Sequence, residues 1–448
     1  DTPEPPDDGV DEGDAASGWT SEWNHEPRIE ILDTSGCEDW DPLPLPDRGL
    51  PEDTEPRLLW DYRPTEQALY AAGASDFRSE VDLPTLSRDG TVWAVGPGLN
   101  LVQHISADGV MLNWFVAGRG DFEDVNAERP VEVATSPEGS AFVVITRPLS
   151  TGTGGRLRRY EPTSRVAGSG ETDLFLREAG RSASIAIGPG GLVFVASGNA
   201  VWATCRGERV LWTLTNEAAP GEELRANFST IFASGEHVFA LSNAERYYRV
   251  PVDGSSVESV GEAEAAGISR SRSVFASFGD DLIERLDESR GSILNTTFVL
   301  PGGVPVEADW LTFSPTGVAY FRDEGLNPAS VLLPPYEGPA TQFVSELEVN
   351  AAPNDNWLAD GSYLDVAGAG GNLVRVSAQG DEVWRLPELG SGTSQDRRVI
   401  SSSGVLYSVR NGNLLAIQLD ELPPDTSFCI RNFDCNEYRN SNRSVLTR

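Results

Sequence analysis

Seven charged or aromatic side chains stand at matching points along the chain, each at the start of a segment expected to form a strand. They are Arg129, Arg181, Arg225, Asp309, Trp310, Trp357 and Arg398. An arginine guanidinium forms two parallel hydrogen bonds to a carboxylate or phosphate, and an indole ring offers a flat surface for stacking. We interpret this set as a candidate binding site for a protein or glycan. The alternative is that these side chains form ion pairs and aromatic contacts between neighbouring structural units.

The chain lacks the signatures of common catalytic sites. It has no phosphate-binding loop, no G-x-S-x-G turn and no H-E-x-x-H motif. Of its three histidines, His104 and His237 fall in expected strands, where we expect a structural role. A pair of carboxylates suited to glycoside hydrolysis stays possible, because any two acids could meet in the folded chain. We therefore predict no catalytic residue, and whether the protein is an enzyme stays open.

Six acidic residues lie in segments expected to connect structural units. They are Asp121, Glu123, Asp124, Glu222, Glu223 and Asp355. Such carboxylates could bind calcium or a basic partner, and solvated surface charge also accounts for them. We expect no cofactor, with calcium the one ion that the sequence leaves possible.

Four cysteines, Cys37, Cys205, Cys429 and Cys435, suggest two disulfides in a secreted protein. Cys429 and Cys435 could close a short local loop, and Cys37 would then pair with Cys205 by elimination alone. Zinc binding has little support, because the chain has no C-x-x-C pair.

A repeated pattern provides the scaffold for these residues. Asp89-Gly90 and Asp108-Gly109 are turn pairs, in which aspartate bonds to its own backbone and glycine takes a positive φ. The strands expected around these turns are 91–95, 99–105 and 110–115. Short β-branched and aromatic strands at this spacing predict an all-β sandwich, barrel or propeller.

The pattern returns along most of the chain. Further units begin at Ser136, Gly188, Ala233, Ser271, Ser314, Ala359 and Ser402. Turn glycines mark most of them, namely Gly90, Gly139, Gly190, Gly235, Gly317, Gly361 and Gly404. The spacing of roughly 43–51 residues is that of four-stranded propeller blades. We predict an eight-bladed β-propeller, with seven blades as the alternative.

The last strand of a unit carries a tryptophan followed by a polar residue, as in Leu211-Trp212-Thr213 and Val383-Trp384-Arg385. This pattern resembles the quinoprotein-type (PQQ-like) propeller repeat, over about residues 57–420. The resemblance implies the fold. It leaves the function open, because such propellers include dehydrogenases, outer-membrane assembly lipoproteins and binding modules. The adjacent cysteines of the dehydrogenases are absent here, which argues against quinone chemistry.

The eighth unit stops after Asp420 without a tryptophan strand. Residues 57–62, RLLWDY, have the composition of the missing strand. An N-terminal strand paired with the last unit would close the ring and remove two exposed edges. A coincidental apolar segment is the alternative.

In a propeller, the longer connections between units are expected to gather on one face, around the central channel of the ring. Loops on a rigid scaffold commonly carry function. Away from this face we expect short connections with tight turns, such as Asp89-Gly90 and Asn411-Gly412.

Composition indicates the compartment and the class of partner. Net charge is −35, and all 34 basic residues are arginine, which argues against nucleic acid and favours cationic partners. No apolar run is long enough to span a membrane. Residues 1–36 are predicted to be a disordered acidic spacer, 37–56 a Pro-rich extended segment, and 421–448 a polar tail with a cysteine pair.

An acidic spacer ahead of a folded domain is similar to that of bacterial surface lipoproteins, whose lipid-bearing cysteine would lie upstream of residue 1. We therefore predict an extracytoplasmic scaffold that binds a protein or glycan through its connecting loops. A metal-dependent lyase or hydrolase at the channel mouth is the alternative. The sequence does not predict the oligomeric state.

Overall fold

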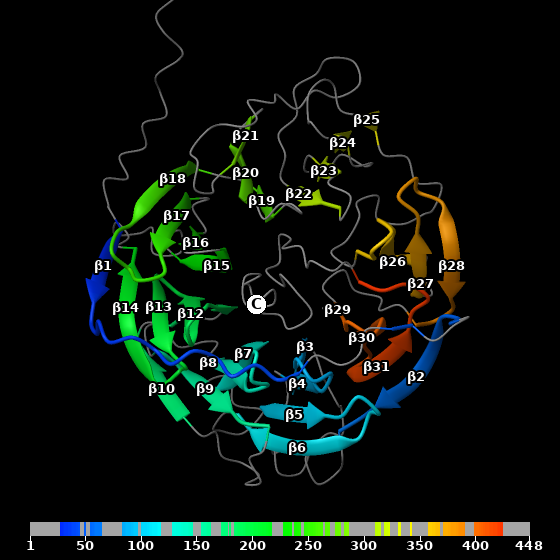
Figure 1. The fold of residues 1–448 in the computed structure, drawn as a ribbon, viewed down its shortest axis with the longest axis horizontal. Helices are drawn as coiled ribbons and strands as arrows, with labels where there is room; N and C mark the ends of the chain where they lie inside the picture. Colours follow the sequence, from blue (N-terminus) through cyan, green and yellow to red (C-terminus); the bar gives the residue numbers. More distant parts are fainter. Residues whose placement is uncertain are drawn as a thin grey trace, which may run out of the picture.

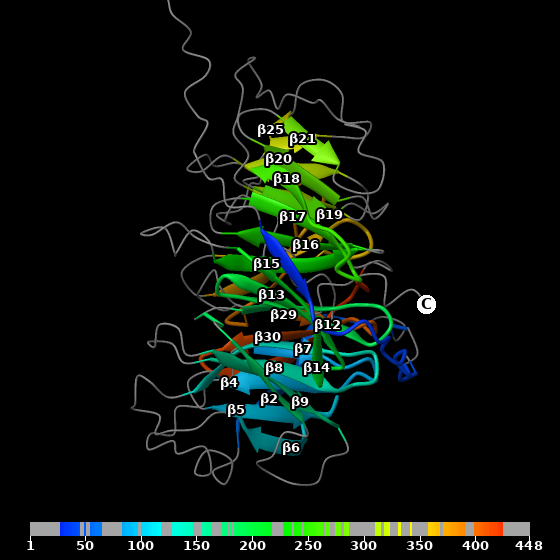
Figure 2. The same ribbon diagram turned by 90° about the vertical axis from the view of Figure 1, so that its left-hand side faces the viewer.

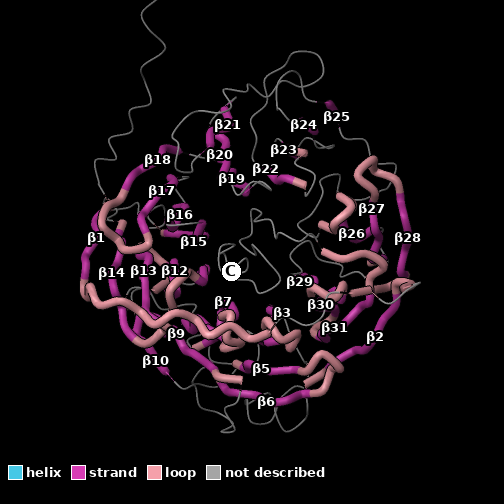
Figure 3. The backbone as a smooth tube through the Cα atoms, viewed as in Figure 1, coloured by secondary structure: helices cyan, strands magenta, loops and turns pink. Residues whose placement is uncertain are grey.

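The computed structural model describes residues 27–44, 49–50, 54–64, 83–96, 100–117, 128–146, 154–162, 172–177, 179–180, 183–216, 227–234, 237–242, 246–262, 265–268, 274–278, 282–285, 310–314, 318–322, 330–332, 341–342, 357–367, 371–389 and 398–423. Within these ranges the chain forms 31 β-strands and no helix (Figure 3). The described residues accordingly include no helix of the length and apolarity needed to cross a membrane.

The strands form eight separate antiparallel sheets, numbered here in chain order. Sheet 1 contains β3 (Leu83–Leu86), β4 (Val92–Gly96), β5 (Leu101–Ile105) and β6 (Met111–Val116). Sheet 2 contains β7 (Arg129–Thr135), β8 (Ala141–Thr146), β9 (Gly155–Tyr160) and β10 (Thr172–Leu176). Sheet 3 contains β11 (Ala183–Ile187), β12 (Leu192–Ser197), β13 (Ala200–Cys205) and β14 (Arg209–Thr215), with β1 (Arg28–Ile31) as a fifth strand. Sheet 4 contains β15 (Phe228–Ser234), β16 (His237–Ser242), β17 (Arg246–Pro251) and β18 (Glu258–Glu262).

The remaining sheets follow the same order. Sheet 5 contains β19 (Ala265–Ile268), β20 (Val274–Phe278) and β21 (Leu282–Arg285). Sheet 6 contains β22 (Trp310–Phe313), β23 (Ala319–Arg322), β24 (Ser330–Leu332) and β25 (Thr341–Gln342). Sheet 7 contains β26 (Tyr363–Ala367), β27 (Asn372–Val376) and β28 (Glu382–Leu386). Sheet 8 contains β29 (Arg398–Ile400), β30 (Val405–Arg410), β31 (Asn413–Gln418) and the N-terminal strand β2 (Arg57–Tyr62).

The sheets stand around a common centre, with strands such as β7, β15 and β29 innermost (Figures 1 and 2). Apolar side chains fill the spaces between neighbouring sheets wherever these side chains are described. One buried cluster joins sheets 2 and 3 and includes Val144 and Ile185, while another joins sheets 3 and 4 and includes Trp212 and Tyr248. Because the described core is divided among such interfaces, these sheets depend on their neighbours for burial of their faces.

The predicted strand at 57–62 is present as β2, and it pairs antiparallel with β31 from Arg57↔Gln418 to Tyr62↔Leu414. Tyr62 also belongs to a buried cluster that joins sheet 8 to sheet 1 through Leu86 and Val92. The first and last sheets along the chain are therefore neighbours in space.

Two predictions about local structure need correction. Residues 28–31 form β1, although they fall within the predicted disordered spacer 1–36. The alternation in Arg28-Ile29-Glu30-Ile31 suits a strand, because Ile29 packs against the core while Arg28 and Glu30 are exposed. The second correction concerns Asn411-Gly412, which we expected away from the face that carries the long connections. This turn joins β30 to β31 at the end of the sheets where β29 begins, and the long connection before β29 reaches the same end.

The two ends of the sheets differ in how they connect strands. We call the end with the turns between first and second strands the turn face. It includes Ser87–Gly90, Ser136–Gly139 and Ser401–Gly404, and each of these turns is closed by a backbone hydrogen bond of 2.9–3.0 Å. As predicted, Gly90, Gly139 and Gly404 have positive φ there. We call the opposite end, where β7 and β29 begin, the connection face.

Candidate functional site

Two of the predicted binding residues, Arg129 and Arg398, lie at equivalent positions in the structure. Each is the first residue of its strand, β7 and β29 respectively, so both lie at the connection face. Both side chains are half-buried. Both residues therefore begin strands that lie toward the common centre of the sheets (Figure 1).

The outer part of sheet 2 carries paired charges. Arg156 lies 3.3 Å from Glu128 and 2.9 Å from Asp173, and Arg158 also contacts Asp173 at 2.9 Å. Burial by itself would raise the pKa of Asp173, but hydrogen bonds and charge from Arg158 and Arg156 outweigh it and hold the pKa below its usual value. These arginines are therefore committed to intramolecular ion pairs.

The other predicted binding residues are not brought together in the described part of the chain. Trp357 is only 3% exposed, and its ring packs edge-on against Tyr363, with 5.5 Å between ring centroids. Its indole thus contributes to the core of sheet 7. Trp310 begins β22, and only its backbone is described. Arg181, Arg225, Asp309, Cys429 and Cys435 lie outside the described residues.

His104 has the structural role that the sequence suggested. Its ring stacks on Trp93 at 4.2 Å with an interplanar angle of 8°, and its Nε2 lies 2.8 Å from the Thr91 hydroxyl. Burial lowers the pKa of His104 to about 4, although the Asp89 charge acts in the opposite direction. The imidazole is therefore neutral at pH 7.

A second feature, which the sequence did not predict as a unit, is an N-terminal belt formed by residues 32–44. It leaves sheet 3 after β1 and crosses the turn face toward sheet 2 (Figure 1, dark blue). The predicted disulfide between Cys37 and Cys205 is present and fixes the belt to the β13–β14 turn, with 5.5 Å between the two Cα atoms. The covalent link joins residues 168 positions apart.

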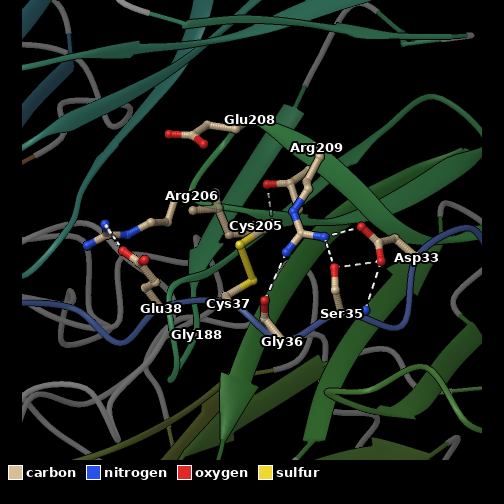
Figure 4. The surroundings of a disulfide bond; sticks show 12 residues. Asp33, Ser35, Gly36, Cys37, Glu38, Gly188, Cys205, Arg206, Glu208 and Arg209 are labelled. Atoms are coloured by element: carbon tan, nitrogen blue, oxygen red, sulfur yellow. Dashed lines mark hydrogen bonds and ion pairs between the residues drawn. A yellow bond between two sulfur atoms is a disulfide. The ribbon is translucent and has the colours of Figure 1, made fainter.

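Arg209 holds the belt on one side of the disulfide. Its guanidinium contacts the Asp33 carboxylate and the Ser35 hydroxyl, and it donates a 2.8 Å hydrogen bond to the Gly36 carbonyl (Figure 4). Hydrogen bonds from Ser35, followed by the contact with Arg209, lower the pKa of Asp33 to about 2. The belt carboxylate is therefore ionised at every physiological pH.

Arg206 holds the belt on the other side. It forms an ion pair with Glu138 of sheet 2 and lies 3.7 Å from Glu38 of the belt. Its guanidinium also lies over the Trp40 ring at 5.3 Å, and the Trp40 indole donates a 2.8 Å hydrogen bond to the Gly188 carbonyl. Trp40 is thereby placed between sheets 2 and 3.

The belt then follows the turn of sheet 2. The Asp41 amide donates to Glu138 and the Leu43 amide donates to the Pro137 carbonyl, both at 2.9 Å. A Cβ at Gly139 would come within 2.7 Å of Leu43, and its φ of +86° also favours glycine. Leu50 lies next to the sheet 8 turn at Gly404, so the chain reaches sheet 8 before it enters β2.

The sequence does contain a signal for this belt. The turn Cys205–Arg209 carries two arginines around a glycine, and the segment 33–41 carries four acidic residues and a tryptophan around a cysteine. This complementarity is visible only once the two segments are known to be adjacent. Within the described residues, no three His, Cys, Asp or Glu side chains gather as a metal site, and the six predicted acidic loop residues lie outside those residues.

No family model and no curated protein matches the chain. Solved structures do resemble it. BamB from Moraxella catarrhalis aligns with a TM-score of 0.50 and 12% identity, over 75% of this chain and 96% of BamB. The computationally designed Ika8 protein aligns with a TM-score of 0.51 and 11% identity, over 81% and 99% of the two chains.

A structure of virginiamycin B lyase from Staphylococcus aureus with quinupristin aligns less well, with a TM-score of 0.46 and 12% identity, over 82% and 100% of the chains. At these identities the likeness concerns fold alone. Together with the arrangement of the antiparallel sheets around a common centre, the likeness to BamB and Ika8 shows that this chain has a β-propeller fold.

Proposed function

We propose that this protein is an exported eight-bladed propeller that binds a protein or glycan partner through its connection face. The observation that carries the proposal is the belt, because residues 32–44 cover part of the turn face through a disulfide, two arginines and a packed tryptophan. The chain itself therefore occupies part of this face, which favours the connection face as the end that is specialised for recognition.

The distribution of loops supports the same face. The connection from β6 to β7 spans residues 117–128, and that from β14 to β15 spans 216–227. On the turn face, by contrast, β7 and β8 are joined by a short turn closed between Gly139 and Ser136. Long and varied connections beside the half-buried Arg129 and Arg398 provide both adaptable surface and fixed positive charge. Arg181, Arg225, Asp309 and Trp310 complete the proposed binding set.

Eight blades in a closed ring are part of this proposal. Its support is that β2 occupies the outer position of sheet 8 and that a buried cluster joins sheet 8 to sheet 1. A β-strand from one end of the chain would thereby fasten the ring at its junction.

Export is supported by the disulfide, because such bonds persist in oxidising compartments and are rare in the cytosol. The net charge of −35 favours a partner with a basic surface. The Pro-rich acidic residues ahead of the belt suit a spacer that holds the ring away from a surface to which the chain is tethered.

Site-specific photo-crosslinking in the native host tests which face binds. A crosslinking amino acid replaces exposed Arg177 at the connection face, and the matched control replaces exposed Gln379 in the β27–β28 turn at the turn face. We expect a discrete crosslinked product from position 177 and none from position 379. Products from position 379 alone, or from neither position, would contradict the proposal.

A further inference from the structure

The strand β1 is the outermost strand of sheet 3, beyond the fourth strand β14 (Figures 1 and 2). Its side-chain pattern differs between its two faces. Ile29 packs against the core, while Arg28 and Glu30 are exposed, and neither makes an ion pair within the described residues. Ile31 and Leu32 are large apolar side chains with 51% and 54% exposure. In a strand at the edge of a sheet, such features indicate a pairing surface.

The register of β1 on β14 shows which backbone groups are directed outward. The Leu32 amide donates to the Leu211 carbonyl at 2.8 Å. Hydrogen-bonded positions alternate in an antiparallel pair, so Arg28 and Glu30 share this inward set. The N–H and C=O groups of Ile29 and Ile31 therefore point away from β14, along the free edge of the described sheet.

The charges on this edge are complementary to themselves. If two copies of β1 pair antiparallel about a two-fold axis at Ile29, the outward groups of the two Ile29 residues face each other. Arg28 of each copy then lies directly opposite Glu30 of the other copy, which gives two cross-strand ion pairs. A two-fold axis requires such an arrangement, because the same surface must fit itself.

A shift of the axis to Glu30 would place the two Glu30 carboxylates opposite each other, and like charges in that position are destabilising. The charge pattern therefore favours the Ile29-centred register over the Glu30-centred one. We propose that the β1 edge is a homodimer interface, in which β1 of a second copy of this chain pairs antiparallel about Ile29. The two sheets numbered 3 then form one continuous sheet across the dimer.

This interface is independent of the proposed connection-face binding site. β1 lies at the circumference of the ring, so a dimer formed through it leaves the connection faces of both copies open. Its small size suits a weak association that depends on protein concentration.

Sedimentation equilibrium of the full chain at about 0.15 M salt, where long-range repulsion is screened, tests this inference. We expect a concentration-dependent dimer for the unaltered protein. Glu30→Arg replaces both ion pairs by arginine pairs, and it should weaken the dimer by about tenfold or more. The matched control is Glu55→Arg, which makes the same charge change at an exposed residue outside β1 and should leave the dimer intact.

The double variant Arg28→Glu/Glu30→Arg exchanges the two charges and restores complementarity only in the Ile29-centred register. We expect it to recover the dimer, which also shows that loss in the single variant is not a folding defect. A monomer at all concentrations for the unaltered protein would overturn the proposal. Equal dimerisation of Glu30→Arg and the unaltered protein, or failure of the double variant to dimerise, would also overturn it.

Discussion

Trp60 of β2 lies against Gly109 of the β5–β6 turn and donates its indole N–H to the Ala107 carbonyl at 2.9 Å. Trp212 of β14 makes the same kind of contact between sheets 3 and 4, against Gly254 and the Val252 carbonyl, at 3.0 Å. In each case a tryptophan on an outer strand packs against a turn of the next sheet and donates a hydrogen bond to it. The equivalence places β2 in sheet 8 in the position that β14 has in sheet 3.

This contact predicts the effect of removing β2. Deletion of residues 1–63 should lower the melting temperature markedly, because it exposes β31 and the cluster that includes Tyr62. Deletion of residues 1–26, which leaves β1, the belt and β2 in place, should change it little. Trp60→Ala in the full chain should cost roughly 2 kcal/mol, from lost apolar burial and one hydrogen bond. Equal melting temperatures for the two truncations would rule out this role for β2.

The disulfide should stabilise the protein by restricting the unfolded chain. Cys37→Ser/Cys205→Ser opens a loop whose ends are 168 residues apart, and the expected loss in unfolding free energy is about 5 kcal/mol. Denaturant unfolding measures this loss. Hydrogen exchange should also accelerate in residues 36–43 more than in β13, because the belt keeps only its non-covalent contacts. Unchanged exchange in the belt would show that the disulfide is not what holds it.

His104 should make stability depend on pH between about 6.5 and 4. Its pKa is about 4 in the folded protein and 6.5 in the unfolded chain, so the unfolded chain binds more protons in this range. The contribution of neutral His104 is fully present above pH 6.5, is lost progressively as the pH falls, and stops changing below about 4. The lost stability is about 3 kcal/mol. In a His104→Gln variant, the melting temperature should depend less on pH over this range. An unchanged dependence on pH would contradict the role of His104.

The arginines of the connection face should matter for binding and little for folding. Arg129→Ala/Arg398→Ala should abolish the crosslinked product formed from position 177, because a carboxylate or phosphate on the partner loses its bidentate donors. The melting temperature should change by only a few degrees. Arg385→Ala, on the outer strand β28, is the matched control and should leave crosslinking unchanged. If both variants lose crosslinking equally, the effect is one of overall charge and not of this site.

Local residue patterns were sufficient to predict much of the fold. Asp89-Gly90 and the turn at Gly139 could be recognised because a β-turn is determined by a few adjacent residues. Trp60 and its neighbours could be recognised as a displaced strand because their composition repeats that of Leu211–Thr213. Asn411-Gly412 was predicted as a turn, but its face depends on strand direction within the sheet and not on the dipeptide.

The sequence by itself determined the all-β repeat, the turn positions, the strand at 57–62 and the acidic character of the chain, because all of these reside in short segments or in composition. Only the tertiary structure decided that Trp40 lies between sheets 2 and 3, that Arg206 and Arg209 hold the belt on the turn face, and that Trp357 is buried. Each of these contacts except the Trp357–Tyr363 packing joins residues more than 100 positions apart. Such contacts depend on how the sheets are placed relative to one another, so the free energy that selects them is not encoded in any one segment.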